Sequence, residues 1–213
     1  MTDDTPRKTS PRTGVILGAV AVLLLLVAGG VYLSLGPEKV ASLFGSQPKE
    51  SNVPIGGPFT LTDQNGKPRT QADFAGKFML IYFGFTYCPD VCPTSLTTIT
   101  DALKILGPKA DAIVPIFITV DPARDTVEQM KMYVEHFDPR FVALTGTPEQ
   151  VVAAAKTYRV YFAKQKDAAP GAEDYLVDHT SITYLMGPKG RFLTHFGHAV
   201  TAEAMAERIR KYL

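Results

Sequence analysis

Residues 78–93 read FMLIYFGFTYCPDVCP. The first eight are almost continuously apolar, which is typical of a parallel strand covered on both faces of a sheet. Two cysteines follow, and apolar residues then recur at helical spacing from Thr94 to Leu106, where Gly107-Pro108 ends the helix. This order of strand, cysteine loop and helix indicates an α/β domain whose chemistry lies beyond the carboxyl end of the strand.

Further strands and helices are expected on both sides of this unit. The apolar patterns predict strands at 59–62, 67–70, 113–120, 141–144, 182–186 and 191–196, and amphipathic helices at 125–137, 148–158 and 202–213. A turn signal at 63–66 joins the first two strands into a hairpin. The order of elements predicts a thioredoxin-like α/β fold with an N-terminal hairpin and right-handed crossovers.

Composition narrows the class of protein. The 213 residues include 22 Lys+Arg and 21 Asp+Glu, a net charge of +1, so the chain lacks the broad basic field of a nucleic-acid-binding protein. Apolar residues make up 46% and charged residues 20%, as in ordinary folded domains. Two cysteines are too few for the multi-disulfide framework of a small secreted scaffold.

Residues 14–36 form an uncharged apolar segment. Roughly 20 apolar residues span a bilayer core of about 30 Å, whereas the apolar core of a signal peptide has only about 7–15. We therefore expect an uncleaved single transmembrane helix at 14–36, although the small residues at 27–30 leave cleavage as an alternative. Arg7, Lys8 and Arg12 precede the span and favour a cytoplasmic N-terminus at 1–13.

A linker and an external domain are expected after this anchor. Residues 37–57 include a stretch rich in Gly, Pro and Ser, and the folded domain is predicted at 58–213. Asp3 and Asp4 argue against a mitochondrial transit peptide. The expected location is the bacterial inner membrane, crossed once, with the C-terminal domain in the periplasm, where disulfides can form.

Cys88 and Cys92 are separated by three residues. On a helix the Cα atoms of such a pair lie about 6 Å apart, within disulfide range, and the N-terminus of the helix expected near Pro93 favours the thiolate form. Three interpretations follow: a permanent local disulfide, an exchangeable redox pair, or two ligands of a soft metal site that suits Cu(I). The thioredoxin dithiol has only two intervening residues and is usually preceded by Trp, which this chain lacks.

A third metal ligand could come from the histidines. His136 is explained by its place late in a helix, and His195 and His198 by surface roles. His179 lies in a polar break between an apolar stretch and the strand at 182–186, so a loop His there could approach the cysteines. Asp178 could support its ring by a hydrogen bond. Spacing alone leaves a surface role for His179 open.

Three motifs together suggest a family. FGFTYCPDVCP at 83–93, VDPARDT at 120–126 and YLVDHT at 175–180 resemble, in this order and behind a single anchor, the Sco/SenC family of membrane-anchored copper proteins. The residue before the first Cys is often His in that family, and here it is Tyr87.

The resemblance implies that Cys88, Cys92 and His179 bind copper, as Cu(I) and as Cu(II). It implies a metallochaperone, a thiol reductant or both, acting in assembly of the binuclear copper A centre of cytochrome c oxidase subunit II or a related acceptor. Cys88 and Cys92 would be the redox-active pair. Other periplasmic copper chaperones and a thioredoxin-like reductase are further expected partners.

Three other acidic residues lie in these motifs. Asp90 is either a turn residue or a carboxylate that tunes the metal site or contacts a partner. Asp121 and Asp125 either end a strand and cap the helix expected at 125–137, or flank the metal site and shape a partner surface.

Enzymes on the same fold class offer a rival interpretation. VCPTS at 91–95 also resembles the peroxidatic segment of peroxiredoxins, in which Cys92 would attack peroxide and Cys88 would resolve it. Position 89 is Pro where that family has Thr, and His179 would have no role. A thiol-disulfide oxidoreductase without copper is the other alternative.

Overall fold

The computed structural model describes residues 16, 18–27, 29–30, 53–165 and 175–213. The chain divides into two units, Met1–Gln47 and Pro48–Leu213. In the first unit residues 18–27 are helical. Within the described parts of the chain, no helix combines the length and apolar character needed to cross a membrane. The segment predicted to span at 14–36 lies only partly among the described residues, and 1–13 and most of 37–57 lie outside them.

The described strands of the second unit form one seven-stranded sheet and one two-stranded sheet. In spatial order the large sheet consists of β2 (Pro68–Thr70), β1 (Thr60–Asp63), β5 (Val142–Thr145), β4 (Ile113–Thr119), β3 (Phe78–Gly84), β8 (Ile182–Met186) and β9 (Phe192–Gly197). The three strands β3, β4 and β5 are parallel, and their other neighbours are antiparallel.

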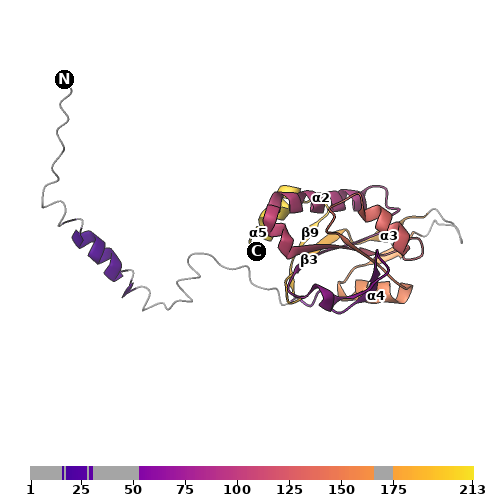
Figure 1. Ribbon diagram of the computed structural model, residues 1–213, viewed down its shortest axis with the longest axis horizontal. Coiled ribbons are helices and arrows are strands. Elements are labelled where there is room, and N and C mark those ends of the chain that lie inside the picture. The colour runs from indigo at the N-terminus through magenta and orange to yellow at the C-terminus, as the bar shows by residue number, and fades with distance from the viewer. Residues whose placement is uncertain (1–15, 17, 28, 31–52, 166–174) are drawn as a thin grey trace, which may run out of the picture. The chain divides into compact units, whose positions relative to one another are not determined.

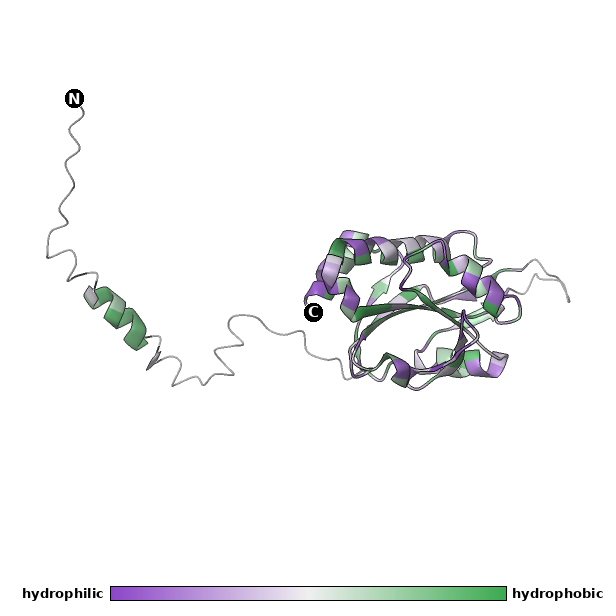
Figure 2. Ribbon diagram, in the orientation of Figure 1, coloured by the Kyte–Doolittle hydropathy of each residue, from purple (hydrophilic) through white to green (hydrophobic). Residues whose placement is uncertain are grey.

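Helices cover both faces of this sheet (Figure 1). Helices α2 (Val91–Leu106) and α5 (Ala202–Arg210) pack together on one face, and α4 (Pro148–Thr157) lies on the other. Helix α3 (Val127–Val134) links β4 to β5, and η1 (Gln71–Phe74) and η2 (Gly107–Ala112) are short 3₁₀ turns. The strands are largely apolar, whereas the helices carry both apolar and polar residues (Figure 2). The predicted thioredoxin-like α/β fold with an N-terminal hairpin is confirmed.

Strand β3 is the most enclosed element. All of its residues after Phe78 are buried, and it pairs with β4 on one edge and β8 on the other. Leu80, Ile81 and Phe83 have no exposed surface. Because side chains alternate across a strand, this burial requires apolar packing on both faces of the sheet. The predicted central strand is therefore present, and it holds the start of the cysteine loop in a fixed place.

The structure differs from the sequence-based prediction at helix α3 and in a second, small sheet. The helix expected at 125–137 is shorter, because Thr126 rather than Asp125 caps it and it ends at Val134. A small sheet of β6 (Phe162–Lys164) and β7 (Val177–His179) has no counterpart among the expected elements. Its strands have three residues each, too few to show the alternation that marks a strand in a sequence.

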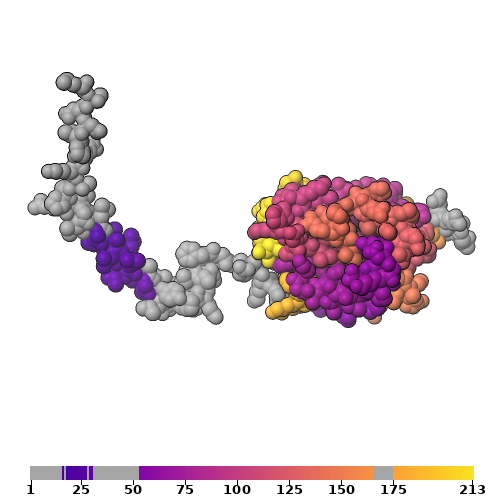
Figure 3. Space-filling view, in the orientation of Figure 1, coloured from indigo at the N-terminus to yellow at the C-terminus, as the bar shows by residue number. Residues whose placement is uncertain are grey.

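The N-terminal hairpin at the sheet edge is held by one carboxylate. Asp63 accepts hydrogen bonds from the backbone N–H groups of Asn65 (2.9 Å) and Lys67 (3.0 Å) and from Nε of Arg69 (2.9 Å). Gly66 adopts a φ of 75°, which the turn requires and which other residues rarely adopt. Figure 3 shows this N-terminal segment of the domain, in purple, on the visible surface.

We predict that Asp63→Ala lowers the free energy of unfolding by about 2–4 kcal/mol. The variant loses the buried carboxylate that pairs with Arg69 and accepts two backbone hydrogen bonds. Burial raises the pKa of Asp63, but its three donors outweigh burial and hold the pKa below its usual range. The stabilisation is thus present above the unfolded-state pKa of about 3.9 and is lost as pH falls through the lower folded-state pKa. Urea unfolding at pH 7 and pH 3 measures both effects.

Asp101→Ala is the matched control for this experiment, because the Asp101 side chain is 48% exposed and forms its ion pair with the still more exposed Lys104. We expect a change below about 0.5 kcal/mol. Equal unfolding midpoints for the two variants at pH 7 would contradict the role of Asp63.

Candidate metal centre

The cysteine loop connects β3 to α2. Cys88 lies in the loop and is partly exposed, whereas Cys92 lies in the first turn of α2 and is fully buried. The helix begins at Val91, two residues before the predicted start near Pro93, so Cys92 is a helical residue. Its backbone N–H donates to Cys88 Sγ at 3.4 Å. Both sulfurs therefore lie at the N-terminus of the helix, where the helix dipole favours negative charge.

His179 is brought to these sulfurs by the small sheet. It is the last residue of β7, paired with Phe162 of β6, rather than the loop residue that the sequence predicted. Its Nε2 lies 3.4 Å from Cys92 Sγ, and its Nδ1 lies 3.4 Å from the carbonyl oxygen of Thr180. When Nδ1 carries the proton and faces Thr180, the lone pair of Nε2 is directed at the cysteines.

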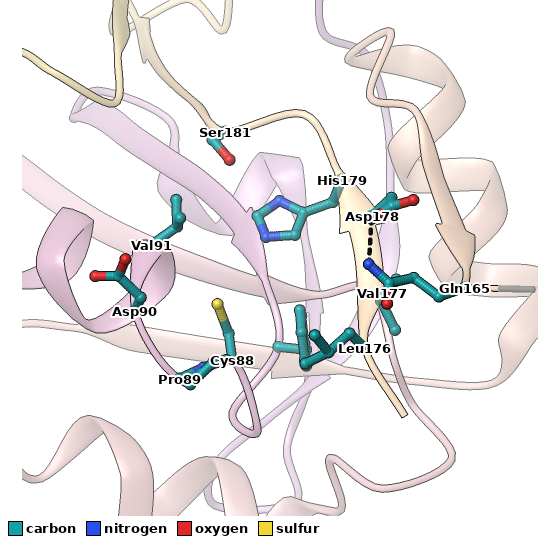
Figure 4. Close-up of a pocket in the computed structure, with 11 residues that line it drawn as sticks. Cys88, Pro89, Asp90, Val91, Gln165, Leu176, Val177, Asp178, His179 and Ser181 are labelled. Atoms are coloured by element: carbon teal, nitrogen blue, oxygen red, sulfur yellow. Dashed lines mark hydrogen bonds between the residues drawn. The ribbon is translucent and has the colours of Figure 1, made fainter. Parts of the chain in front are cut away.

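Cys88, Cys92 and His179 form a cluster in which all three ligand atoms lie within 4.8 Å of one another. Figure 4 shows the Cys88 sulfur and the His179 ring facing the same space. Both cysteines are free thiols. Two sulfurs are soft donors of the kind that select Cu(I), and an imidazole nitrogen also binds copper. Within the described residues, His136, His195 and His198 belong to no such cluster.

The two thiols differ in acidity because they are hydrogen-bonded to each other. The bond from the Cys92 thiol holds the pKa of Cys88 well below its usual range; burial opposes this effect, and the His179 ring adds to it. The same bond and burial raise the pKa of Cys92. We therefore expect the Cys88 thiol, the more exposed of the two, to ionise first.

Gly84 permits the close approach of α2 to the end of β3. A Cβ atom at this position would lie 2.7 Å from Cys92 Sγ and 3.0 Å from the ring of Phe117. On the same face of the strand, Tyr82 OH lies 3.9 Å from the same sulfur. Gly84 is not among the site residues predicted from the sequence, although a Gly inside a strand that is otherwise bulky and apolar is the signal that could have revealed it.

Asp125 supports the cysteine loop from the end of β4. Its buried carboxylate accepts hydrogen bonds from the Thr86 N–H (3.1 Å) and from the hydroxyls of Thr86 (2.6 Å) and Thr119 (2.6 Å). Burial raises the pKa of Asp125, although these hydrogen bonds oppose it. The prediction that Asp125 caps a helix is wrong, because Thr126 accepts the capping bond from the Gln129 N–H. Asp125 instead fastens the loop to the end of β4.

The other acidic residues of the motifs occupy two environments. Asp121 is buried, whereas Asp90 and Asp178 are exposed and line an open cavity of about 280 Å³ together with Cys88 and His179. Asp178 accepts a hydrogen bond from Gln165 Nε2 (2.9 Å), and Figure 4 shows this bond on the side of the strand away from the His179 ring. The carboxylates of Asp121 and Asp125 are too enclosed to form a partner surface.

Comparison with known proteins agrees with this geometry. A family model described as SCO1/SenC matches residues 47–213. The chain belongs to the SCO1/SenC family. It is 40% identical over 192 residues to the SCO2-like protein RP587 of Rickettsia prowazekii, covering 88% of this chain and 92% of that protein.

Two solved structures of Sco proteins are similar to it. The copper-bound structure of Bradyrhizobium japonicum ScoI has 46% identity and a TM-score of 0.68, and the match covers 75% of this chain and 99% of that one. BsSco, described as a member of the Sco family of cytochrome c oxidase assembly proteins with a disulfide switch, has 25% identity and a TM-score of 0.60. That match covers 77% of this chain and 97% of the BsSco chain.

We predict that iodoacetamide modifies Cys88 much faster than Cys92 in the native protein, because only Cys88 is exposed and its pKa is lowered. The rate at Cys88 should stay near its plateau as pH falls from 8 to 6, whereas an ordinary thiol with a pKa near 8.5 loses about a hundredfold. Mass spectrometry of peptides measures both rates. Faster labelling of Cys92, or an ordinary pH profile at Cys88, would contradict the geometry.

Proposed function

We propose that this chain is a copper metallochaperone that binds one copper ion through Cys88, Cys92 and His179. We further propose that it serves assembly of the binuclear copper A centre in subunit II of cytochrome c oxidase or a related acceptor. The cluster of two thiols and one imidazole nitrogen within 4.8 Å carries this proposal. Copper in the ScoI structure and the assembly role stated for the family of BsSco support it.

The residues fit copper as a transferable cargo. Thiolates favour Cu(I), and the added imidazole nitrogen makes the donor set compatible with Cu(II) as well. Cys92 forms the buried, inner side of the cluster, while Cys88 and His179 border the open cavity. A partner that approaches through the cavity would meet Cys88 and His179 but not the buried Cys92, so ligand exchange between sulfurs would begin at Cys88. Asp90 and Asp178 lie at the same opening.

We predict near-unit Cu(I) stoichiometry for the reduced full-length protein in detergent, loaded without oxygen and titrated against a chromogenic Cu(I) chelator. Cys88→Ser, Cys92→Ser and His179→Ala should each weaken the affinity by at least about tenfold. His195→Ala is the matched control, because His195 is an exposed histidine that stacks on Phe192 away from the cluster. Equal affinity for His179→Ala and His195→Ala would exclude His179 as a ligand.

The acceptor is tested with the same loaded protein. Mixing it with the metal-free, reduced soluble domain of subunit II should transfer two Cu(I) ions, and one-electron oxidation with ferricyanide should then produce the purple mixed-valence copper A absorbance. The Cys88→Ser protein should deliver no copper. Tight copper binding without any transfer to this domain would refute the proposed acceptor and leave copper binding intact.

The cysteine geometry also favours a second candidate function, reduction of the acceptor's own cysteines. The Cys88 thiolate would attack the acceptor disulfide, form a mixed disulfide and release one acceptor thiolate. Cys92 would then lose its proton and attack Cys88, which releases the second acceptor thiolate and leaves a Cys88–Cys92 disulfide. The acceptor gains two electrons, and a thioredoxin-like reductase would restore the pair.

The burial of Cys92 disfavours the peroxidase alternative, which needs that sulfur to meet peroxide.

We predict that Cys92→Ser traps a mixed disulfide between Cys88 and an oxidised subunit II domain, because the second attack cannot occur. Cys88→Ser should trap none, since Cys92 has no exposed surface. Non-reducing electrophoresis and mass spectrometry detect the adduct. If Cys92→Ser forms no adduct while the wild-type protein still transfers copper to the acceptor, copper alone is the cargo.

We also propose the topology of the chain. Residues 1–13 would be cytoplasmic, 14–36 a single transmembrane anchor in a bacterial inner membrane, 37–57 a linker, and 58–213 a periplasmic copper-binding domain. The support is the uncharged sequence of 14–36 and the helix at 18–27, in which Leu23 to Leu26 expose more than 60% of their surface. Such exposed leucines suit a lipid environment. The similarity to a Rickettsia protein is in keeping with a bacterial source.

A further inference from the structure

Arg124 lies outside the donor cluster and contacts three segments that build it. It belongs to the loop between β4 and α3, and its side chain is only 12% exposed. The three segments are its own loop, the cysteine loop, and the segment that leads into β7. The copper chemistry proposed above gives this residue no role. Because burying a charged side chain is costly, the contacts of Arg124 indicate what its burial achieves.

The first set of contacts fixes the guanidinium to the end of β4. Nε of Arg124 donates to Asp121 Oδ2 at 2.6 Å, and both side chains are largely buried. The other carboxylate oxygen of Asp121 accepts a hydrogen bond from the Tyr175 hydroxyl at 2.7 Å. The carboxylate therefore holds both Arg124 and Tyr175 against the main sheet.

The second set of contacts reaches the small sheet. Nη2 of Arg124 donates to the Tyr175 carbonyl oxygen at 2.9 Å, and the guanidinium carbon lies 3.6 Å from the centre of the Tyr175 ring. Lys164 of β6 places Nζ 3.5 Å from the centre of the same ring. Tyr175 stands two residues before β7, whose last residue is His179. Both strands of the small sheet are thereby tied to one tyrosine.

The third set of contacts reaches the cysteine loop. The guanidinium carbon lies 4.7 Å from the ring centre of Tyr87, the residue before Cys88, and 5.8 Å from that of Phe85. Phe85 in turn meets the His179 ring edge-on, with the ring centres 5.8 Å apart. One guanidinium thus bridges the loop that carries the sulfurs and the segment that leads to the imidazole.

We propose that Arg124 is a positioning residue that sets the distance between His179 and the Cys88–Cys92 pair. Strands β6 and β7 pair with each other and are not hydrogen-bonded into the seven-stranded sheet. A two-stranded ribbon is marginally stable alone, so its place depends on side-chain contacts. Arg124 provides the ion pair, the carbonyl bond and the stacked ring at once, which requires the planar fork of arginine. The expected effect on Cu(I) affinity rests on the proposed function, whereas the expected effect on the contact between His179 and Phe85 does not.

The test compares Arg124→Lys with Arg140→Lys in the full-length protein. Arg140 is the matched control, because it forms a comparable bond to the buried Asp138 (2.8 Å) remote from the cluster. In metal-free protein, NMR follows the His179 ring protons, which the edge-on Phe85 and Tyr82 rings shift, and the contact between His179 and Phe85. Cu(I) affinity is then measured by chelator competition.

Arg124→Lys should lose the His179–Phe85 contact and bind Cu(I) about 10–100-fold more weakly, whereas Arg140→Lys should keep both properties. If Arg124→Lys keeps the contact and binds Cu(I) as tightly as Arg140→Lys, the positioning role is overturned and the proposed function stands. If the wild-type protein binds no copper and only Arg124→Lys loses the contact, the proposed function fails and the positioning role stands.

Tyr175→Leu provides a second test of the proposal, which holds even if Arg124→Lys does not fold. This variant removes the stacked ring and the hydroxyl bond while it leaves the Asp121–Arg124 ion pair in place. It should also displace His179 and weaken Cu(I) binding. If Arg124→Lys does not fold, unchanged His179 shifts in Tyr175→Leu overturn the proposal.

Discussion

The burial of β3 on both faces and on both edges is the constraint on which the site depends. A strand so enclosed cannot shift its register without moving apolar side chains to the wrong face, so the point where the chain leaves the sheet is fixed. That point is Gly84, whose missing side chain lets the first turn of α2 bring Cys92 against the strand. The cysteine loop follows from this geometry, with one sulfur buried and one exposed.

The imidazole reaches the sulfurs by a different route. It stands on a small sheet that hydrogen-bonds to no strand of the large one, so side-chain contacts place it: Val177 packs into the core, and polar side chains hold the segment before β7. The VDPARDT segment supplies them: Asp125 fastens the cysteine loop, and Asp121 with Arg124 fastens the segment before β7. One loop at the end of β4 therefore supports both halves of the donor cluster, which explains why three motifs distant in sequence meet in space.

Much of this arrangement could be predicted from the sequence. Long apolar runs and helical spacing identify β3, β4, α2 and α5, because burial leaves a periodic pattern. The small sheet could not be predicted, since each of its strands has three residues and its position depends on Arg124 and Tyr175. The structure brings Cys88, Cys92 and His179 together, as the motifs indicated. The support from Asp125 and the clearance at Gly84 depend on distances between segments, which one sequence does not reveal.

Two sulfurs and one imidazole nitrogen are proposed to hold a single copper ion. X-ray absorption spectroscopy of the Cu(I)-loaded full-length protein tests this most directly, with His179→Ala measured beside the wild type. We expect a Cu(I) edge and scattering shells of two sulfurs and one nitrogen, with the nitrogen shell lost in the variant. A spectrum of two sulfurs alone in the wild type, or an imidazole signal that persists in His179→Ala, would contradict the proposed donor set.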